Sequence, residues 1–165
     1  MAGRRVFFSF HYEEDVWRAT IVRNATKVDA ASAAAWNDAS MWEEAKRKGQ
    51  AELQRKIDAA LRGTSVTAVL IGAETAERRW VKYEIERSVA KGNGLLGVRI
   101  DRLKDESGQR GQRGAVPDPL AEYGARIYDW KRSDFGHWVE VAAMAAGKPC
   151  LKHGRQNCFS CRWFW

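Results

Sequence analysis

The stretch RRWVKYEIERS, residues 78–88, places a glutamate four positions after a tryptophan. In a helix this spacing sets Trp80 and Glu84 one turn apart, on neighbouring surface. Helical periodicity points Val81 inward and Arg87 outward, with Trp80 and Glu84 on the border between the two faces. A carboxylate there can be partly desolvated against the indole, as functional acids often are. A surface glutamate that pairs with Arg87 is the alternative, and the spacing alone favours it.

A second set of chemically active side chains lies in the last sixteen residues: Cys150, His153, Cys158 and Cys161. Thiolates and imidazoles at such pairwise spacings bind zinc. Only four residues separate His153 from Cys158, so the metal loop would be cramped, and unligated reduced cysteines are the favoured interpretation. An odd number of cysteines without an export signal argues against a disulfide framework.

Two patterns associated with phosphate chemistry do not fit their usual context. The sequence GNGLLG, residues 92–97, matches G-x-G-x-x-G but precedes a strand, whereas a phosphate-binding loop joins a strand to a helix. A phospho-acceptor domain would need an aspartate after the strand that ends in VLIG, and none is present there.

The elements that must position these residues alternate between short apolar strands and amphipathic helices. Strands are predicted over residues 4–10, 65–72, 94–100 and 125–130, with a weaker second strand within 23–30. Helices are predicted over 12–22, around Leu53, Ile57 and Leu61 up to Gly63, over 74–91, and from Phe135 to Gly147. Residues 101–119 are rich in glycine and charge and predict a long exposed loop.

This alternation predicts an α/β fold: a flavodoxin-like, doubly wound, mostly parallel five-stranded sheet with helices on both faces. Ligands of such sheets bind beyond the carboxyl ends of the strands. The residues that follow Phe10, Gly72, Ile100 and Trp130 are therefore the first candidates for a site.

Length and composition are those of one globular domain, expected over residues 1–149, followed by a cysteine- and aromatic-rich tail over 150–165. The net charge of +7 favours acidic partners, such as nucleic acid, an anionic surface or a phosphate-bearing small molecule. A basic solvated surface is the plain alternative, and the charge alone favours it. The absence of a targeting signal and of an apolar run of about 18 residues predicts a cytoplasmic protein without a membrane helix.

Three segments together resemble a TIR domain: RRVFFSFHYEED, GTSVTAVLIGAETAERRWVKYEIERS and GNGLLGVRI. They are most similar to the TIR-like family of the Thoeris anti-phage system, over roughly residues 4–146. The first TIR box, an apolar strand that ends in serine and an aromatic residue, corresponds to residues 6–10. The helix of enzymatic TIR domains carries tryptophan, three residues and glutamate, here Trp80 and Glu84.

The resemblance implies an enzyme of the NAD nucleosidase or ADP-ribosyl cyclase type, with NAD as substrate and no separate cofactor. It would release nicotinamide and produce a cyclic or related ADP-ribose signal. Nicotinamide leaves as a neutral molecule and needs no general acid, unlike most glycosidic leaving groups. Glu84 would be the catalytic group, an ionised carboxylate that stabilises positive charge developing on the ribose.

The residues around the end of the first strand would then bind substrate. Phe10 and Tyr12 could stack on nicotinamide or adenine, although Phe10 fits the core equally well. Ser9 could bond a ribose hydroxyl or merely satisfy the strand end, and Trp80 would form a wall beside Glu84. His11 stands where many enzymatic TIR domains place arginine, which weakens the expected contact to phosphate.

The implied partners are a downstream effector that senses the nucleotide product and a phage-derived trigger. The alternative function is a non-catalytic TIR-like module that assembles with copies of itself or with a partner protein. Nucleic-acid binding through the GQRGQRG loop, residues 108–114, is less favoured, because such a loop is more often a solvated linker.

Overall fold

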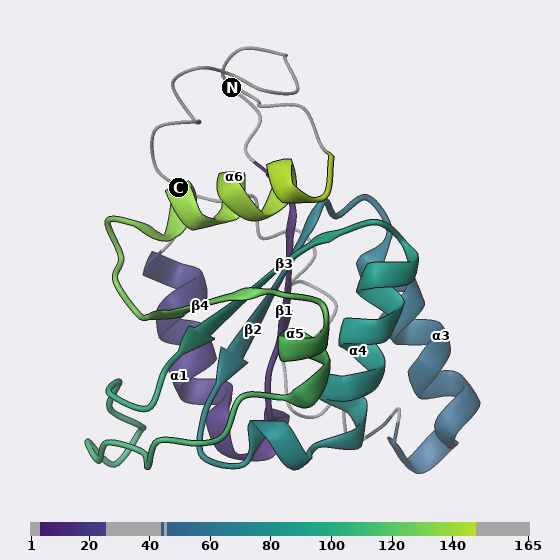
Figure 1. The fold of residues 1–165 in the computed structure, drawn as a ribbon. Coiled ribbons are helices and arrows are strands. Elements are labelled where there is room, and N and C mark those ends of the chain that lie inside the picture. Colours follow the sequence, from purple (N-terminus) through teal and green to yellow (C-terminus); the bar gives the residue numbers. More distant parts are fainter. Residues whose placement is uncertain (1–3, 26–43, 45, 148–165) are drawn as a thin grey trace.

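The computed structural model describes residues 4–25, 44 and 46–147 of the chain (Figure 1). The strands are β1 (Val6–Ser9), β2 (Val66–Ile71), β3 (Gly94–Arg99) and β4 (Arg126–Asp129). The helices are α1 (Tyr12–Ala25), α3 (Gln50–Leu61), α4 (Arg79–Ala90), α5 (Asp118–Glu122) and α6 (Phe135–Ala145), with a 3₁₀ turn, η2 (Thr75–Glu77). The predicted alternation of strands and helices is confirmed.

The four strands form one parallel sheet in the order β1-β2-β3-β4. The predicted α/β class, with a parallel sheet between helices, is therefore confirmed. Four strands are described where five were expected. The weak second strand was predicted within residues 23–30; residues 23–25 instead end α1, and 26–30 lie outside the described residues.

Both faces of the sheet are covered, and β2 is buried along its whole length. Val69 and Ile71 point toward α4 and α5, where they pack in one apolar cluster with Val81, Ile85 and Leu120. The alternate residues of β2 belong to a larger cluster that includes side chains of α1 and α6. Figure 1 shows α3 beside α4. A nearly continuous apolar run is what a strand covered on both sides requires.

Two predicted helix ends are confirmed, and one predicted start is wrong. Gly63 and Gly147 follow α3 and α6 with φ of 77° and 75°, conformations that glycine adopts without strain. The helix predicted to begin at residue 74 begins at Arg79. The chain first forms η2, and Arg78 then adopts an extended conformation with φ −80° and ψ 115°, which interrupts the helical run.

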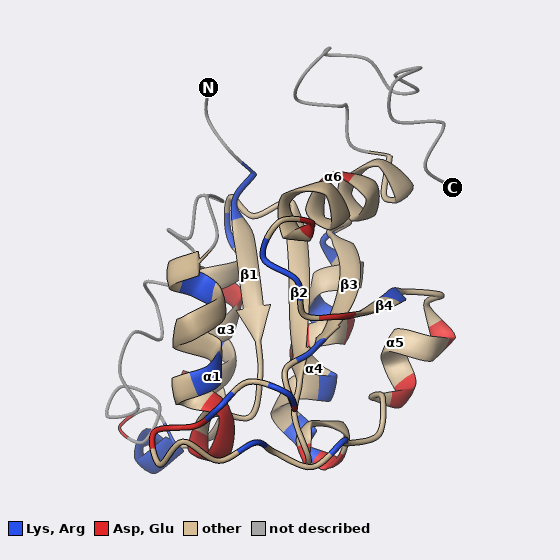
Figure 2. Ribbon diagram, turned by 90° about the vertical axis from the view of Figure 1, so that its left-hand side faces the viewer, with Lys and Arg blue, Asp and Glu red and all other residues tan. Residues whose placement is uncertain are grey.

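The segment after β3 is mostly exposed, as predicted, but it is tied to the domain. Arg18 of α1 donates from Nε to the carbonyl of Leu103 at 3.0 Å and from Nη2 toward Asp105 at 3.3 Å. Arg99 donates to the carbonyl of Gly114 at 2.8 Å. Figure 2 shows charged residues gathered in the loops at this carboxyl end of the sheet, whereas β1 and β2 contain none.

None of the helices in the described part of the chain is both long enough and apolar enough to cross a membrane.

Candidate active site

Glu84 lies on the buried face of α4, against the carboxyl end of β1. Its side chain is 0% exposed, and its Oε2 accepts a hydrogen bond from the hydroxyl of Ser9, which is also fully buried. The predicted border position is wrong, because α4 turns Glu84 toward the sheet together with Val81 and Ile85. The surface alternative is wrong as well: Arg87 pairs with Asp58, with Nε 2.7 Å from Oδ1.

The environment of Glu84 favours its neutral form. Burial raises the pKa of Glu84 to about 8, and the hydrogen bond from Ser9 offsets part of that rise. Oε1 has no hydrogen-bond partner among the described residues. The ionised carboxylate expected from the sequence is therefore not the favoured form at neutral pH in this setting. A buried acid with one unsatisfied oxygen is costly to the fold, which is typical of a functional group.

A chain of buried hydroxyl groups fixes α4 at this height on the sheet. Ser88 Oγ donates to the carbonyl oxygen of Glu84 at 2.6 Å, and Thr67 Oγ1 of β2 donates to Ser88 Oγ at 2.7 Å. Asn93 Nδ2 donates in turn to Thr67 Oγ1 at 3.3 Å. Because buried polar groups bond in only a few arrangements, this chain specifies the rotation of α4 and hence the position of Glu84.

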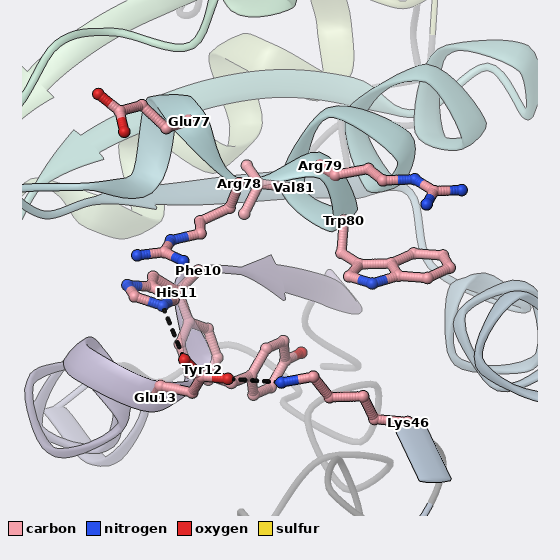
Figure 3. A pocket seen from close by; sticks show the side chains of 10 residues that line it. All are labelled: Phe10, His11, Tyr12, Glu13, Lys46, Glu77, Arg78, Arg79, Trp80 and Val81. Atoms are coloured by element: carbon pink, nitrogen blue, oxygen red, sulfur yellow. Dashed lines mark hydrogen bonds and ion pairs between the residues drawn. The ribbon is translucent and has the colours of Figure 1, made fainter. Parts of the chain in front are cut away.

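A cavity of about 320 Å³ opens where β1 ends and α4 begins (Figure 3). Its lining residues are Phe10, His11, Tyr12, Glu13, Lys46, Glu77, Arg78, Arg79, Trp80 and Val81. The volume is within the range of about 300–1,000 Å³ common for small-molecule sites. The structure thus brings four of the sequence-predicted substrate residues, Phe10, His11, Tyr12 and Trp80, to one cavity.

One wall of the cavity is aromatic. The rings of Phe10 and Tyr12 lie 4.2 Å apart between centroids, tilted by 37°. Trp80 packs edge-on against Tyr83, with centroids 5.7 Å apart. Phe10 is only 2% exposed and belongs to the core, so both roles considered for it are compatible with its position. Such a wall suits the flat face of a heteroaromatic ring.

A carboxylate bridges two basic side chains at the β1–α1 side of the cavity. Glu13 Oε1 lies 2.8 Å from Nζ of Lys46, and Oε2 lies 3.7 Å from Nε2 of His11. The hydrogen bond that Lys46 donates, and then the positive charge of Lys46, lower the pKa of Glu13. His11 is 5% exposed, and neither ring nitrogen has a hydrogen-bond partner in the described structure.

Two arginines at the start of α4 complete the lining and were missed in the sequence. Arg78 pairs with Glu74, and Arg79 Nη2 donates to Oε1 of Gln50 at 3.0 Å. The guanidinium carbon of Arg79 also lies 5.3 Å from the ring centroid of Trp80. Their position directly before Trp80 in the sequence could have identified them as candidates for the lining.

Glu84 itself does not line the cavity. Trp80 and Val81, one turn earlier on α4, line the cavity. Ser9, which donates a hydrogen bond to Glu84, directly precedes the lining residue Phe10 in the sequence. Burial raises the pKa of Tyr12 well above its ordinary value, and the nearby charge of Glu84 adds to that rise. The structure therefore places the Ser9–Glu84 pair directly behind the aromatic wall.

The four residues considered as a zinc set and not favoured as one, Cys150, His153, Cys158 and Cys161, lie outside the described residues. Within residues 4–25, 44 and 46–147, no group of three or more His, Cys, Asp or Glu side chains is placed to hold a metal ion.

Comparison with known proteins agrees with the resemblance drawn from the motifs. The family described as "Thoeris protein ThsB, TIR-like domain" matches residues 7–105, a range that contains Ser9, Glu84 and every residue lining the cavity. The protein named "Putative cyclic ADP-D-ribose synthase ThsB1" of Bacillus cereus (strain MSX-D12) is 40% identical over 155 residues, which cover 87% of this chain and 78% of that protein. The chain belongs to the Thoeris ThsB family and carries its TIR-like domain.

Proposed function

We propose that this chain cleaves the bond between nicotinamide and ribose in NAD and produces an ADP-ribose-type signal in anti-phage defence. One observation carries the proposal: a fully buried carboxyl group, Glu84, with an oxygen unpartnered among the described residues, lies directly behind an aromatic-lined cavity. The name of the Bacillus cereus relative supports a cyclic product. NAD is the substrate, and no separate cofactor takes part.

The proposed chemistry needs one carboxylate. Nicotinamide departs from a cationic pyridinium as a neutral molecule, so positive charge passes to the ribose as the bond breaks. Glu84 stabilises that charge from a fixed position in a poorly hydrated site. Because burial raises the pKa of Glu84 to about 8, the acid must first lose its proton. A bound pyridinium cation favours that loss, since a nearby positive charge lowers the pKa of an acid.

The wall of the cavity determines what attacks the ribose. Phe10, Tyr12 and Trp80 present aromatic surface to the nicotinamide ring and must shift for the ribose to reach Glu84. Water that is excluded by this wall cannot compete with a hydroxyl of the same molecule. We therefore infer that attack within the molecule, which gives a cyclic product, prevails over hydrolysis.

The test is NAD turnover by the full chain with extract from phage-infected cells, which supplies the proposed trigger. Mass analysis follows nicotinamide and the nucleotide product. Wild type is expected to release both, and Glu84→Gln to release neither while its circular dichroism spectrum stays native. Glu86→Gln is the matched control, because Glu86 is an exposed glutamate on the same helix. It is expected to behave as wild type.

Turnover that survives in Glu84→Gln would refute the proposal. Defence against phage that is equally strong in wild type and Glu84→Gln, with no nicotinamide released by either, would instead support a non-catalytic assembly module. The downstream effector that senses the product is tested separately, by adding the product from wild-type reactions to cells that carry Glu84→Gln.

A further inference from the structure

The loop after β3, residues 101–116, connects α1 to the turn after β2, and these two segments lead to opposite sides of the cavity. We infer that this loop and Arg18 together form an autoinhibitory clasp, which holds the first turn of α1 in place in front of Glu84. This role rests on the proposed function, because it concerns the access of NAD to that acid. The clasp itself lies outside the cavity lining.

Arg18 attaches the loop to α1. Its guanidinium donates to the carbonyl oxygens of Leu103 at 3.0 Å and Gln109 at 3.3 Å. It also pairs with Asp105 of the loop at 3.3 Å and with Asp15, one turn earlier on α1, at 3.2 Å. The Arg18 side chain is almost fully buried. Because these hydrogen bonds are charge-assisted, α1 cannot leave the loop without a substantial loss of free energy.

The part of the loop that Arg18 contacts is a small hairpin. Lys104 and Arg110 form an antiparallel bridge. The backbone N–H of Asp105 donates to the carbonyl oxygen of Gln109 at 2.8 Å, and the N–H of Gln109 donates back to Oδ1 of Asp105 at 2.8 Å. Arg18 therefore bonds a preformed turn whose acceptors are already fixed, not a solvated linker.

Gly114 places the other end of the loop on the turn after β2. A Cβ atom at Gly114 would lie 2.0 Å from the carbonyl oxygen of Gly72 and 2.6 Å from that of Ala73, so the two backbones are in direct contact. A close approach of this kind requires glycine. Arg99 of β3 donates to the carbonyl oxygen of Gly114 at 2.8 Å. The loop is thus fixed to the sheet as well as to α1.

Both segments that the clasp joins continue into the cavity lining. On one side, α1 begins with the lining residue Tyr12. On the other, the N–H of Gly72 donates to Oγ1 of Thr75 at 2.9 Å and stabilises η2, which ends with the lining residue Glu77. Asp15 adds a direct contact, because a Cβ atom at Gly72 would lie 2.0 Å from its Oδ2. The clasp therefore keeps the two sides of the cavity together.

The closed arrangement restricts access to Glu84. Phe10 and Tyr12 line the cavity in front of the acid and must shift before the ribose can reach it. The first turn of α1 cannot move away from the sheet while Arg18 bonds a loop that is seated on the turn after β2. Contacts that exist only in the closed arrangement favour it over an open one. The clasp therefore lowers the turnover of the resting protein.

Gly114→Ala tests the clasp and leaves the cavity lining unchanged. The added methyl group would overlap the carbonyl oxygen of Gly72, so the loop must leave the turn. We expect nicotinamide release from NAD by the full chain, without extract from infected cells, to rise about fivefold or more over wild type. Gly136→Ala is the matched control, because its methyl group would meet no atom within 4 Å. It is expected to release nicotinamide as wild type does.

Asp105→Asn is a milder variant that should fold even if Gly114→Ala does not. Asparagine keeps an oxygen that can accept from Ser107 and Gln109, and it removes the negative charge beside Arg18. Loss of this partly exposed ion pair is expected to raise resting release about two- to fivefold. Adding Glu84→Gln to either clasp variant should abolish the gain, which would show that the same acid is responsible.

Amide hydrogen exchange over residues 12–16 gives a readout independent of turnover. Exchange there should be faster in Gly114→Ala than in wild type or Gly136→Ala, while the circular dichroism spectrum stays native. Unchanged exchange in Gly114→Ala would overturn the inference. If wild type cleaves NAD with the extract but both clasp variants keep the wild-type resting rate, the clasp fails and the proposed function stands. If no form of the chain cleaves NAD even with the extract, the proposed function itself fails.

Discussion

The Ser9 hydroxyl donates to Oε2 of Glu84 and joins the last residue of β1 to the buried face of α4. The two carboxyl oxygens therefore differ in hydrogen bonding, because Oε1 has no partner among the described residues. This one bond both holds the acid in place and opposes the effect of burial on its pKa.

Ser9→Ala tests that relationship. Both oxygens of Glu84 would then lack a described partner, and the pKa of Glu84 would rise further, because the hydrogen bond lowers it in wild type. We expect the pH profile of kcat/KM to move to higher pH and the free energy of unfolding to fall by about 1–3 kcal/mol. Ser107→Ala, in an exposed loop, should change neither. An unmoved profile would contradict the role assigned to Ser9.

The pH dependence of wild-type turnover follows from the same group. If the ionised carboxylate acts, kcat/KM rises with pH and levels off above about 8, the pKa of Glu84. The kcat profile should reach its plateau at lower pH, because the bound pyridinium favours ionisation and kcat reports groups in the complex. Nicotinamide release across the range from about pH 6 to 9 checks both profiles. A kcat/KM that falls with pH throughout would oppose the proposal.

Stability should also depend on pH through Glu84. Its pKa rises from 4.5 to about 8 on folding, so the folded state holds the proton more tightly across that window. Wild type therefore loses stability as pH rises from about 4.5 to 8, at up to about 1.4 kcal/mol for each pH unit. Urea unfolding of Glu84→Gln should lack this component. The stability of the variant relative to wild type should therefore increase with pH, and a difference that stays constant would rule out the buried acid.

Arg18 should matter for stability more than a surface arginine. It is 8% exposed, bonds the loop after β3 and pairs with Asp15, which is 2% exposed. Arg18→Met would leave that buried carboxyl unpaired, at a cost of about 3 kcal/mol. We expect lower stability and faster amide exchange in the loop around Leu103. Asp15→Asn added to Arg18→Met should recover part of the loss, and Arg87→Met should cost far less.

Much of the fold could be predicted because its signals are local. A continuous apolar run predicts β2, leucine and isoleucine every fourth residue predict α3, and glycines mark the ends of α3 and α6. The predicted start of α4 was wrong because the Thr75 hydroxyl accepts a hydrogen bond from the backbone N–H of Gly72 and stabilises a 3₁₀ turn in place of the first helical turn. Nothing in the periodicity of that stretch separates the two outcomes.

The sequence predicted several residues of the site, but not how the fold arranges them. Ser9 and Glu84 are 75 positions apart in the chain, so no local pattern shows that a strand-end hydroxyl would hold the glutamate inside. Hydrophobic periodicity assigns glutamate to a border or a surface by default, which is why its full burial was not foreseen. Lys46 and Arg78 reach the cavity from separate elements, and only the folded arrangement shows that they meet.

α4 carries both Glu84, the proposed catalytic group, and Trp80, which lines the cavity, and the hydrogen bond between Ser88 and Thr67 anchors the helix on β2. If α4 moves as a rigid body, Trp80 and Glu84 move together. A tilt of the helix therefore does not expose Glu84 to the cavity that Trp80 lines. Access to Glu84 therefore requires movement of the segment that faces α4, where Phe10 and His11 connect β1 to α1, together with a shift of the Trp80 side chain.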